Sequence, residues 1–418
     1  MSSAAVVPRK LSQKEIASYM MRTSGPELFF SFNFATLTTT NVPKNIQLNR
    51  PLQAVILQWK GRVAVTTAAY TAVAVEALQN ILQRITLRGT HKDFGALTPF
   101  DGSGATLFAL ARLYSSGGGR GNSRILSKIT AGALAGNWPF EQTFVGQPVL
   151  QPDLTIPMGL TPGGGAPVAN AFGTINSWDI EVDWYLPVYP YGTPDAQAIG
   201  YVYDPADWGQ TLQLVIQTGD FSSYGTNASS ANVAFTAFGS GAGVPVVNIL
   251  LDYVSLGPLR NSIKKAVCIR NIQSPAAVLS SAGNAVRLQL LQNYKTATVS
   301  VKKGTVLAGT SAGVVVYATL SDTITDQTVL RVDNKPLKNF QFDSVTKEFY
   351  GIRYQTVQPQ GYLGISFVDG YNSLTVFPGD GLPGGAQFDV AANVVIPSAS
   401  NLIEVVQEMI LGDVAAAG

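Results

Sequence analysis

The chain is poor in the residues that build most catalytic and metal sites. Its 418 residues include one cysteine, Cys268, and one histidine, His91. A single cysteine excludes an internal disulfide and a metal cluster held by several thiolates of one chain. The lone histidine excludes zinc sites with two or three imidazoles. His91 lies between polar neighbours in "LRGTHKDFG", so we expect it to be a solvated loop residue. A catalytic base would also need a partner that orients the imidazole. We predict no enzymatic activity, no metal and no cofactor.

Charge and long apolar runs are also scarce. Charged residues make up 13% of the chain and the formal net charge is +2, so no strong positive field favours a specific nucleic acid as partner. No stretch approaches 18 uncharged apolar residues, and the N-terminus lacks the apolar core of a signal peptide. We therefore expect a soluble protein that is made in a reducing cytosol. The hydrophobic content of 46% excludes a disordered chain.

Glycine and proline, in contrast, are abundant and separate short strand-like segments. The chain has 41 Gly and 23 Pro. "LFFSFNFATLT" alternates Phe30, Phe32 and Phe34 with polar residues, and "LQAVILQWKGRVAV" and "TLQLVIQTG" are rich in β-branched and aromatic residues. Similar segments fill the second half. This pattern predicts an all-β fold of two successive antiparallel units divided near residue 258, with long loops at 115–124, 159–173 and 221–243.

Two segments of the first half have helical spacing instead. "EALQNILQRI" places Leu78, Ile81, Leu82 and Ile85 on one helical face, and Ser103 is positioned to cap a helix over "GATLFALARLY". The segment "NLIEVVQEMILG" near the end of the chain fits either a last strand or a capped helix.

Three acidic residues alternate with apolar ones in "WDIEVDWYLPVYPY". Asp179, Glu181 and Asp183 share one face of the expected strand, and side chains two residues apart lie about 6.5–7 Å from each other. Such carboxylates can catalyse or bind metal, but a catalytic pair normally has one member in an apolar setting. We expect the acids to form a solvated outer face or to pair with Lys or Arg on a neighbouring strand.

Residues 11 to 22, "LSQKEIASYMMR", predict a short amphipathic helix with a capping box at Ser12 and Glu15. The basic residues around it exceed the acidic ones; they are Arg9, Lys10, Lys14 and Arg22. A helix beneath the body of the fold is the simpler interpretation, and a helix facing an anionic membrane surface is the alternative.

The order of these segments resembles the double-jelly-roll major capsid proteins of tailless icosahedral phages with an internal membrane, the tectivirus group. The resemblance is carried by "LQNILQRITLRG…FDGSGATLFALARLY" and by "YLPVYP…QTLQLVIQ". It covers most of the first unit and is only architectural in the second.

The resemblance implies two consecutive eight-stranded jelly rolls, 25–258 and 259–418, preceded by a basic helical arm, 1–24. It further implies homotrimers of pseudo-hexagonal outline in a virion shell assembled in the host cytoplasm, with loops as outer towers. The implied partners are other copies of the chain, minor capsid and vertex proteins, and an inner viral membrane near the basic arm.

A carbohydrate-binding or carbohydrate-active β-sandwich, such as a spike or lectin-like protein, is the rival hypothesis. The connector after the acidic strand is rich in aromatic residues that could stack on sugars. In the capsid hypothesis the same side chains are expected at contacts between subunits. These residues are Tyr189, Tyr191, Tyr201, Tyr203 and Trp208.

Overall fold

The computed structural model describes residues 25–34, 41–65, 72–73, 78–114, 124–129, 139–143, 169–170, 173–174, 177–191, 193, 199–219, 225–226, 233–240, 242–256, 266–273, 285–289, 295–306, 317–320, 327–332, 335–341, 361–366, 387–391 and 401–412. In this part of the chain nearly all regular structure is antiparallel β. The helices are α2 (Gly104–Tyr114) and the short 3-10 turns η1 (Gln79–Ile81) and η3 (Ile199–Tyr201). The predicted all-β class is confirmed.

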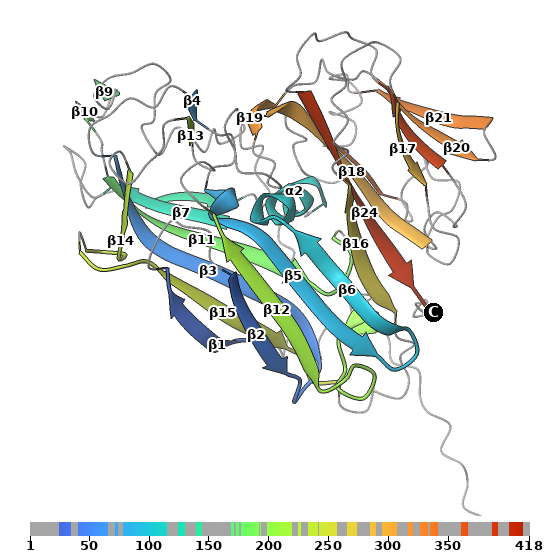
Figure 1. Ribbon diagram of the computed structural model, residues 1–418, viewed down its shortest axis with the longest axis horizontal. Helices are drawn as coiled ribbons and strands as arrows, with labels where there is room; N and C mark the ends of the chain where they lie inside the picture. The colour runs from blue at the N-terminus through green and yellow to red at the C-terminus, as the bar shows by residue number, and fades with distance from the viewer. Residues whose placement is uncertain are drawn as a thin grey trace, which may run out of the picture.

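The first unit contains eight main strands in two facing sheets (Figure 1). One sheet runs in the order β1-β15-β3-β11 and the other in the order β2-β12-β5-β6. In chain order these strands are β1 (Gly25–Asn33), β2 (Asn41–Gln47), β3 (Leu52–Val65), β5 (Leu82–His91), β6 (Gly95–Gly102), β11 (Ser177–Pro187), β12 (Thr211–Thr218) and β15 (Val246–Tyr253).

The second unit repeats this connectivity. Its sheets run β16-β24-β18-β22 and β17-β23-β20-β21. The strands are β16 (Val267–Gln273), β17 (Ala285–Gln289), β18 (Lys295–Val306), β20 (Gln327–Val332), β21 (Lys335–Gln341), β22 (Tyr362–Ser366), β23 (Gln387–Ala391) and β24 (Asn401–Leu411).

When the eight strands of each unit are counted in chain order, both units have one sheet ordered 1-8-3-6 and one ordered 2-7-4-5. This is the topology of an antiparallel jelly roll. The predicted pair of eight-stranded jelly rolls is thus present. The first roll ends at Tyr253 and the second begins at Val267; the expected division at residue 258 falls within 257–265, outside the described residues.

Shorter strands extend this framework. β7 and β8 continue the first sheet beyond β11, β14 pairs with β3, and β19 pairs with β18. The additional strands are β4 (Ala72–Val73), β7 (Arg124–Ile129), β8 (Pro139–Thr143), β9 (Ala169–Asn170), β10 (Gly173–Thr174), β13 (Gly225–Thr226), β14 (Val233–Thr236) and β19 (Tyr317–Leu320).

Short strands of the first roll lie beyond one end of its sheets. β4, β9, β10 and β13 are seen at the upper left of Figure 1. At the opposite end residues 48–51 and 92–94 join their strands directly, and the connector between β11 and β12 also lies there. The described parts of the predicted loops 159–173 and 221–243 include β9, β13 and β14.

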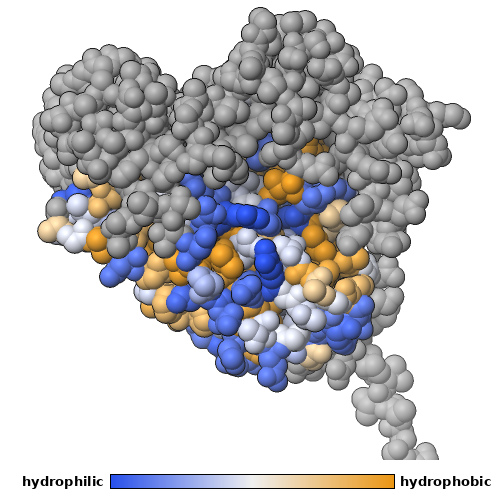
Figure 2. All heavy atoms as spheres, in the orientation of Figure 1, coloured by the Kyte–Doolittle hydropathy of each residue, from blue (hydrophilic) through white to orange (hydrophobic). Residues whose placement is uncertain are grey.

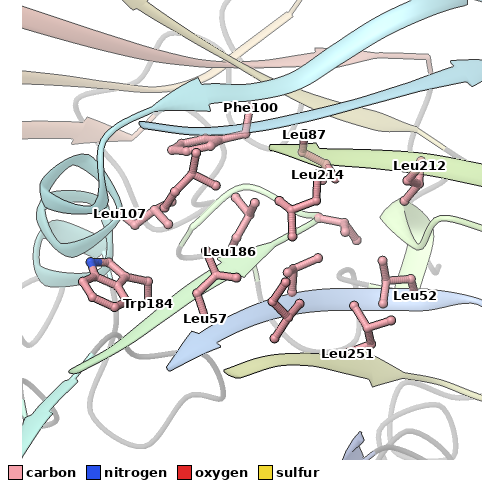
Figure 3. Close-up of a cluster of buried hydrophobic side chains, with 14 of the residues drawn as sticks. Leu52, Leu57, Leu87, Phe100, Leu107, Trp184, Leu186, Leu212, Leu214 and Leu251 are labelled. Carbon is pink, nitrogen blue, oxygen red and sulfur yellow. The ribbon is translucent and has the colours of Figure 1, made fainter. Parts of the chain in front are cut away.

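The core of the first roll is formed by the inward side chains of both sheets. In Figure 3, Leu57, Leu186 and Leu251 of one sheet face Leu87 and Leu214 of the other, and all five are at most 1% exposed. Each fully buried side chain of this size stabilises the fold by about 1.5–3 kcal/mol.

Helix α2 follows the capping signal that the sequence predicts. The hydroxyl of Ser103 accepts a hydrogen bond from the Thr106 amide at 3.1 Å, which satisfies one free N–H of the first turn. At Gly104 a Cβ would collide with the Trp184 indole and with the Gln79 carbonyl oxygen, which accepts the indole N–H at 3.0 Å. Glycine lets the helix begin directly on this buried ring.

The predicted helix over "EALQNILQRI" is wrong. Only Gln79–Ile81 form a 3-10 turn, and Leu82 already begins β5. β5 lies between β12 and β6, and from Arg84 onward the exposed Arg84 and Arg88 alternate with the buried Ile85 and Leu87. The pairing of β5 with β12 shifts register between Leu82 and Arg84, which breaks the alternation at the start of the strand. The spacing of Leu78, Ile81, Leu82 and Ile85 fits a helix, but β5 pairs with a strand on each side, and this pairing stabilises the extended conformation.

The end of the chain is a strand. β24 pairs with β16 on one side and with β18 on the other, over nearly its whole length. Residues 403–411 are all buried, as expected for a central strand.

Candidate functional site

The two jelly rolls meet along a joint formed by β6, β16 and α2. β6 lies beside β16, each at the edge of its own sheet, and α2 contacts β22 (Figure 1). At Gly102 of β6 a Cβ would collide with the Cδ1 atom of Ile272 on β16. Ile272 also packs against two buried hydrophobic clusters, each of which contains residues of both rolls. The edges of the two rolls therefore interlock through an apolar side chain and a glycine.

A buried ion pair lies inside this joint. The Arg270 Nε atom donates to Glu408 Oε1 at 2.9 Å, and the two side chains are 1% and 0% exposed. The other guanidinium nitrogens donate to the carbonyl oxygens of Pro187 at 2.9 Å and Tyr189 at 2.7 Å. Arg270 and Glu408 belong to the second roll and the two carbonyls to the end of β11, so the guanidinium fixes the connector of the first roll to the second.

Glu408 is satisfied by neighbours from both rolls. Its second oxygen accepts the Thr298 hydroxyl at 2.7 Å, and the Tyr191 amide donates to the carboxylate at 3.1 Å. Burial raises the pKa of Glu408, and the positive charge of Arg270 opposes that rise. Burial also raises the pKa of Cys268, two residues before Arg270, to about 12. This thiol is a packed core group and not a reactive one.

The hydroxyl of Tyr114, at the end of α2, makes a second polar contact across the joint. It donates to the Val299 carbonyl at 2.9 Å and accepts the Ile365 amide at 3.0 Å and the Ser300 hydroxyl at 3.0 Å. At Gly364 a Cβ would lie 3.0 Å from this hydroxyl. The helix of the first roll is thereby anchored on adjacent strands of the second.

The five connector aromatics are core residues of their own chain. Each is at most 5% exposed; they are Tyr189, Tyr191, Tyr201, Tyr203 and Trp208. Burial raises the pKa values of the Tyr191 and Tyr203 hydroxyls. None of the five presents a ring on which a sugar or another subunit could stack.

Asp179 and Glu181 of β11 pair with basic residues of β3, as expected, but Asp179 and Asp183 are less solvated than the alternation indicates. Asp179 makes two hydrogen bonds with Arg62, at 2.8 and 3.2 Å, and accepts the Gly239 amide at 3.1 Å. Glu181 pairs with Lys60 at 2.9 Å. Asp179 and Asp183 are only 5% and 7% exposed. The solvated-face expectation is therefore wrong for these two. At Asp179 the Arg62 guanidinium and the Gly239 amide contact the carboxylate.

His91 is also not a solvated loop residue. It is the last residue of β5 and is 5% exposed. Its ring stacks on Phe94 at 4.8 Å and meets Trp208 edge to face at 5.4 Å, while Nδ1 accepts the Asp93 amide at 3.2 Å. The polar neighbours in the sequence form the β5–β6 turn, and the ring packs beneath it.

The predicted N-terminal helix and its basic residues Arg9, Lys10, Lys14 and Arg22 lie outside the described residues. Within the described part, no three His, Cys, Asp or Glu side chains are grouped as metal ligands. No helix among the same residues is long and apolar enough to cross a membrane.

One surface feature was missed by the sequence interpretation. Among described residues the exposed large hydrophobic side chains are Leu28, Phe29, Phe94 and Phe238, and the first two adjoin on edge strand β1. Leu28 is 63% exposed. Phe29 is the extra residue of a β-bulge against β15, which shifts the alternation at this point. The sequence "ELFF" could have indicated this exposed apolar surface, because adjacent residues of a regular strand face opposite sides and Leu28 and Phe29 cannot both point to the core.

The buried ion pair was missed as well. "VCIRNIQ" and "VVQEMIL" each contain one charged residue within an apolar strand, and this pattern would have indicated a pair.

The amino-acid sequence matches no protein-family model and no curated protein. The fold, in contrast, is similar to solved virus capsids. The major capsid protein of Sulfolobus turreted icosahedral virus (STIV) superposes with a TM-score of 0.54 at 12% identity, covering 93% of this chain and 96% of that one. A capsid model of the virus PBCV-1 superposes with a TM-score of 0.50 at 12% identity, covering 94% and 97%. The similarity spans both jelly rolls and shows that they form the double-jelly-roll fold of these proteins.

Proposed function

We propose that the protein is a major capsid protein, a structural subunit of a virion shell without catalytic activity. The observation that carries the proposal is the repeated 1-8-3-6 and 2-7-4-5 topology in one chain. It is supported by the similarity to the STIV capsid protein over more than nine tenths of both chains. A joint held by a buried ion pair and a buried tyrosine hydroxyl suits a subunit that must act as one rigid block.

The finer proposal is a homotrimer that assembles into an icosahedral shell. Two similar rolls per chain give six similar blocks per trimer, which suits the pseudo-hexagonal outline that the resemblance implies. Closed rings of identical chains are common among soluble oligomers. The predicted loops 115–124, 159–173 and 221–243 would then form the outer towers.

The N-terminal arm and the remaining partners complete the proposal. Arg9, Lys10, Lys14 and Arg22 would face the anionic surface of an inner viral membrane, with each charge contributing about 1 kcal/mol. Many copies on a shell would convert this weak attraction into firm adhesion. Minor capsid and vertex proteins would bind the assembled shell in the host cytoplasm. The solved structures with a similar fold include capsid proteins of archaeal and algal viruses. The fold therefore does not restrict the host to bacteria.

Sedimentation and electron microscopy of the purified protein test the proposal. We expect a species of three times the chain mass of 44.3 kDa that assembles further into shells. A stable monomer at micromolar concentration would refute the capsid role.

Flotation with anionic vesicles tests the arm separately. Deleting residues 1–24 should abolish flotation and leave the trimer and its melting temperature unchanged. A variant with the four basic residues changed to Gln should behave like the deletion. Retained flotation in both variants would exclude the arm as the membrane contact.

The carbohydrate-binding alternative has less support. Its stacking platform would be the connector aromatics, and these are buried in the core. Asp179 and Glu181, the other candidates for sugar chemistry, are paired with Arg62 and Lys60.

A further inference from the structure

The sixth main strand of the second roll is much shorter than its counterpart in the first. β22 pairs with β18 over five residues, whereas β11 pairs with β3 over eleven. β11 also has β7 on its other side, while in the described part of the chain β22 pairs with β18 alone. Strand pairing therefore holds β22 less firmly than β11, although every residue of β22 is buried.

Helix α2 of the first roll packs directly on β22. The two elements are in contact, and Figure 1 shows α2 between β11 of the first roll and β18 of the second. Leu113 and Tyr114 of the helix share a buried hydrophobic cluster with Tyr362 of β22. At Gly364 a Cβ would lie 3.1 Å from the Cβ of Leu113 and 3.0 Å from the hydroxyl of Tyr114. The absence of a side chain at Gly364 thus lets the helix lie against the backbone of the strand.

The Tyr114 hydroxyl takes part in the hydrogen bonding between β18 and β22. Val299 and Ile365 are partners in this strand pair. The hydroxyl donates to the Val299 carbonyl at 2.9 Å and accepts the Ile365 amide at 3.0 Å, so it bridges the two partners. One side chain of the first roll is therefore part of a sheet of the second, although Tyr114 and Ile365 are 251 residues apart in the chain.

The same contact distinguishes the correct register of β22. Gly364 is the only glycine of this strand, and it lies next to Leu113 and Tyr114. A slip of β22 by one residue would turn its other face toward the helix. The side chain of Leu363 or Ile365 would then enter a space in which even a Cβ is crowded. The helix therefore accepts β22 in one register.

The two rolls differ in how much of their sheets water can solvate. On β5 of the first roll the exposed Arg84 and Arg88 alternate with buried residues, and hydrophilic residues lie among hydrophobic ones on the face toward the viewer in Figure 2. In the second roll, residues 296–304 of β18, all of β22 and residues 403–411 of β24 are buried. These strands have no solvated face within the described residues, so the second roll needs the first as a cover.

We propose that α2 is a folding template for the second roll: Leu113 and Tyr114, held in place by the folded first roll, fix the position and register of β22 on β18. Domains generally fold as units, the N-terminal one first during synthesis. Contacts between residues far apart in the chain form late, because a long loop must close before the contact stabilises it. A helix already fixed on the first roll gives β22 a partner that is ready. The second roll therefore closes after the first, whatever assembly the chain forms.

Hydrogen exchange of the native full-length chain tests the contact. In Tyr114→Phe two buried backbone groups lose their partner, so exchange of residues 361–366 should accelerate by about tenfold or more relative to β3 and β11. The matched control is Tyr185→Phe, which removes a buried hydroxyl that contacts Tyr189 of the same roll at 3.4 Å. It should leave the relative exchange of 361–366 unchanged. Equal acceleration across both rolls in Tyr114→Phe would overturn the inference.

Refolding tests the order of events. During refolding from urea, pulsed hydrogen exchange should show protection of β3 and β11 before that of β22. In Tyr114→Phe the strands of the first roll should be protected at an unchanged rate, and the protection of β22 should be slower by about tenfold. Protection of β22 as early as that of β11 in the unmodified chain would contradict the template, and so would an equal rate for β22 in the two chains.

Ser300→Ala is the milder variant if Tyr114→Phe does not fold. It removes a hydroxyl that donates to the Tyr114 hydroxyl at 3.0 Å, and it leaves the tyrosine in place. Exchange should rise severalfold within residues 361–366 and nowhere in the first roll. Unchanged exchange of this segment, or a rise spread over both rolls, would exclude the template.

Discussion

Replacing either partner of the buried Arg270–Glu408 pair should destabilise the chain, but only the loss of Arg270 should make the destabilisation depend on pH. In Glu408→Gln the guanidinium keeps its charge but loses its counter-charge. In Arg270→Met the carboxylate keeps its hydrogen bonds from Thr298 and Tyr191 but loses its counter-charge, and the carbonyls of Pro187 and Tyr189 lose their donor. Removing one partner of a fully buried ion pair typically costs about 3–5 kcal/mol of unfolding free energy, so we expect this cost for both variants at pH 7.

The pH dependence separates the two variants. Arginine stays protonated at all accessible pH, so the cost of Glu408→Gln should change little between pH 7 and pH 5. In Arg270→Met the pKa of Glu408, already raised by burial, rises further because the opposing charge is gone. A carboxyl with a higher pKa in the folded chain binds its proton first in that state. Acidification toward its unfolded pKa therefore stabilises the fold, and rising pH removes this stabilisation.

The expected recovery for Arg270→Met is up to about 1.4 kcal/mol for each pH unit in this window. Equilibrium urea unfolding, followed by far-UV circular dichroism at pH 7, 6 and 5, measures it. Arg50→Met is the matched control, because it breaks a half-exposed pair with Glu27 and should have little effect at any pH.

Two results would refute this reasoning. A cost near that of Arg50→Met would mean that water reaches the joint. A cost of Arg270→Met that does not fall on acidification would mean that Glu408 is not the isolated buried charge.

Three further changes test the packing. Gly104→Ala should lower the free energy of unfolding by about 1–3 kcal/mol, because the new methyl group would collide with a buried indole and a carbonyl oxygen. Gly25→Ala is the control, because a Cβ there meets no atom within 4 Å. Equal melting temperatures of the two variants would contradict this prediction. Asp179→Asn should destabilise by about 1–3 kcal/mol in urea unfolding, since Arg62 loses its charge partner in a buried setting; an unchanged midpoint would restore the solvated-face interpretation. Cys268 should not react with a maleimide at pH 8 in the folded chain, because its pKa of about 12 leaves almost no thiolate, and it should react after denaturation. Rapid labelling of the folded protein would show that the core opens.

Local residue patterns determined much of the secondary structure of the first roll. The β-branched and aromatic residues of "LQAVILQWKGRVAV" predict a strand, and β3 occupies that whole segment. Ser103 predicts the start of α2 because a capping hydroxyl acts on amides of the next turn. Asp333 and Asn334 are residue types that favour a turn, and the flanking Val332 and Lys335 pair with each other in the β20–β21 hairpin. Each of these signals acts over a few residues, which is why the sequence alone carries it.

Tertiary structure decided the features that depend on distant neighbours. Leu82–His91 form a strand because β12 and β6 flank it, although the spacing fits a helix. Asp179 is buried because Arg62 and Gly239 reach it from 117 and 60 residues away. Glu408 tolerates burial only because Arg270 lies opposite, 138 residues earlier in the chain. The sequence shows how polar one face of a strand is. The burial and the ion pairs of that face are determined by other segments that folding brings next to it. The energies of burial and ion pairing depend on distances in space and not on separation along the chain.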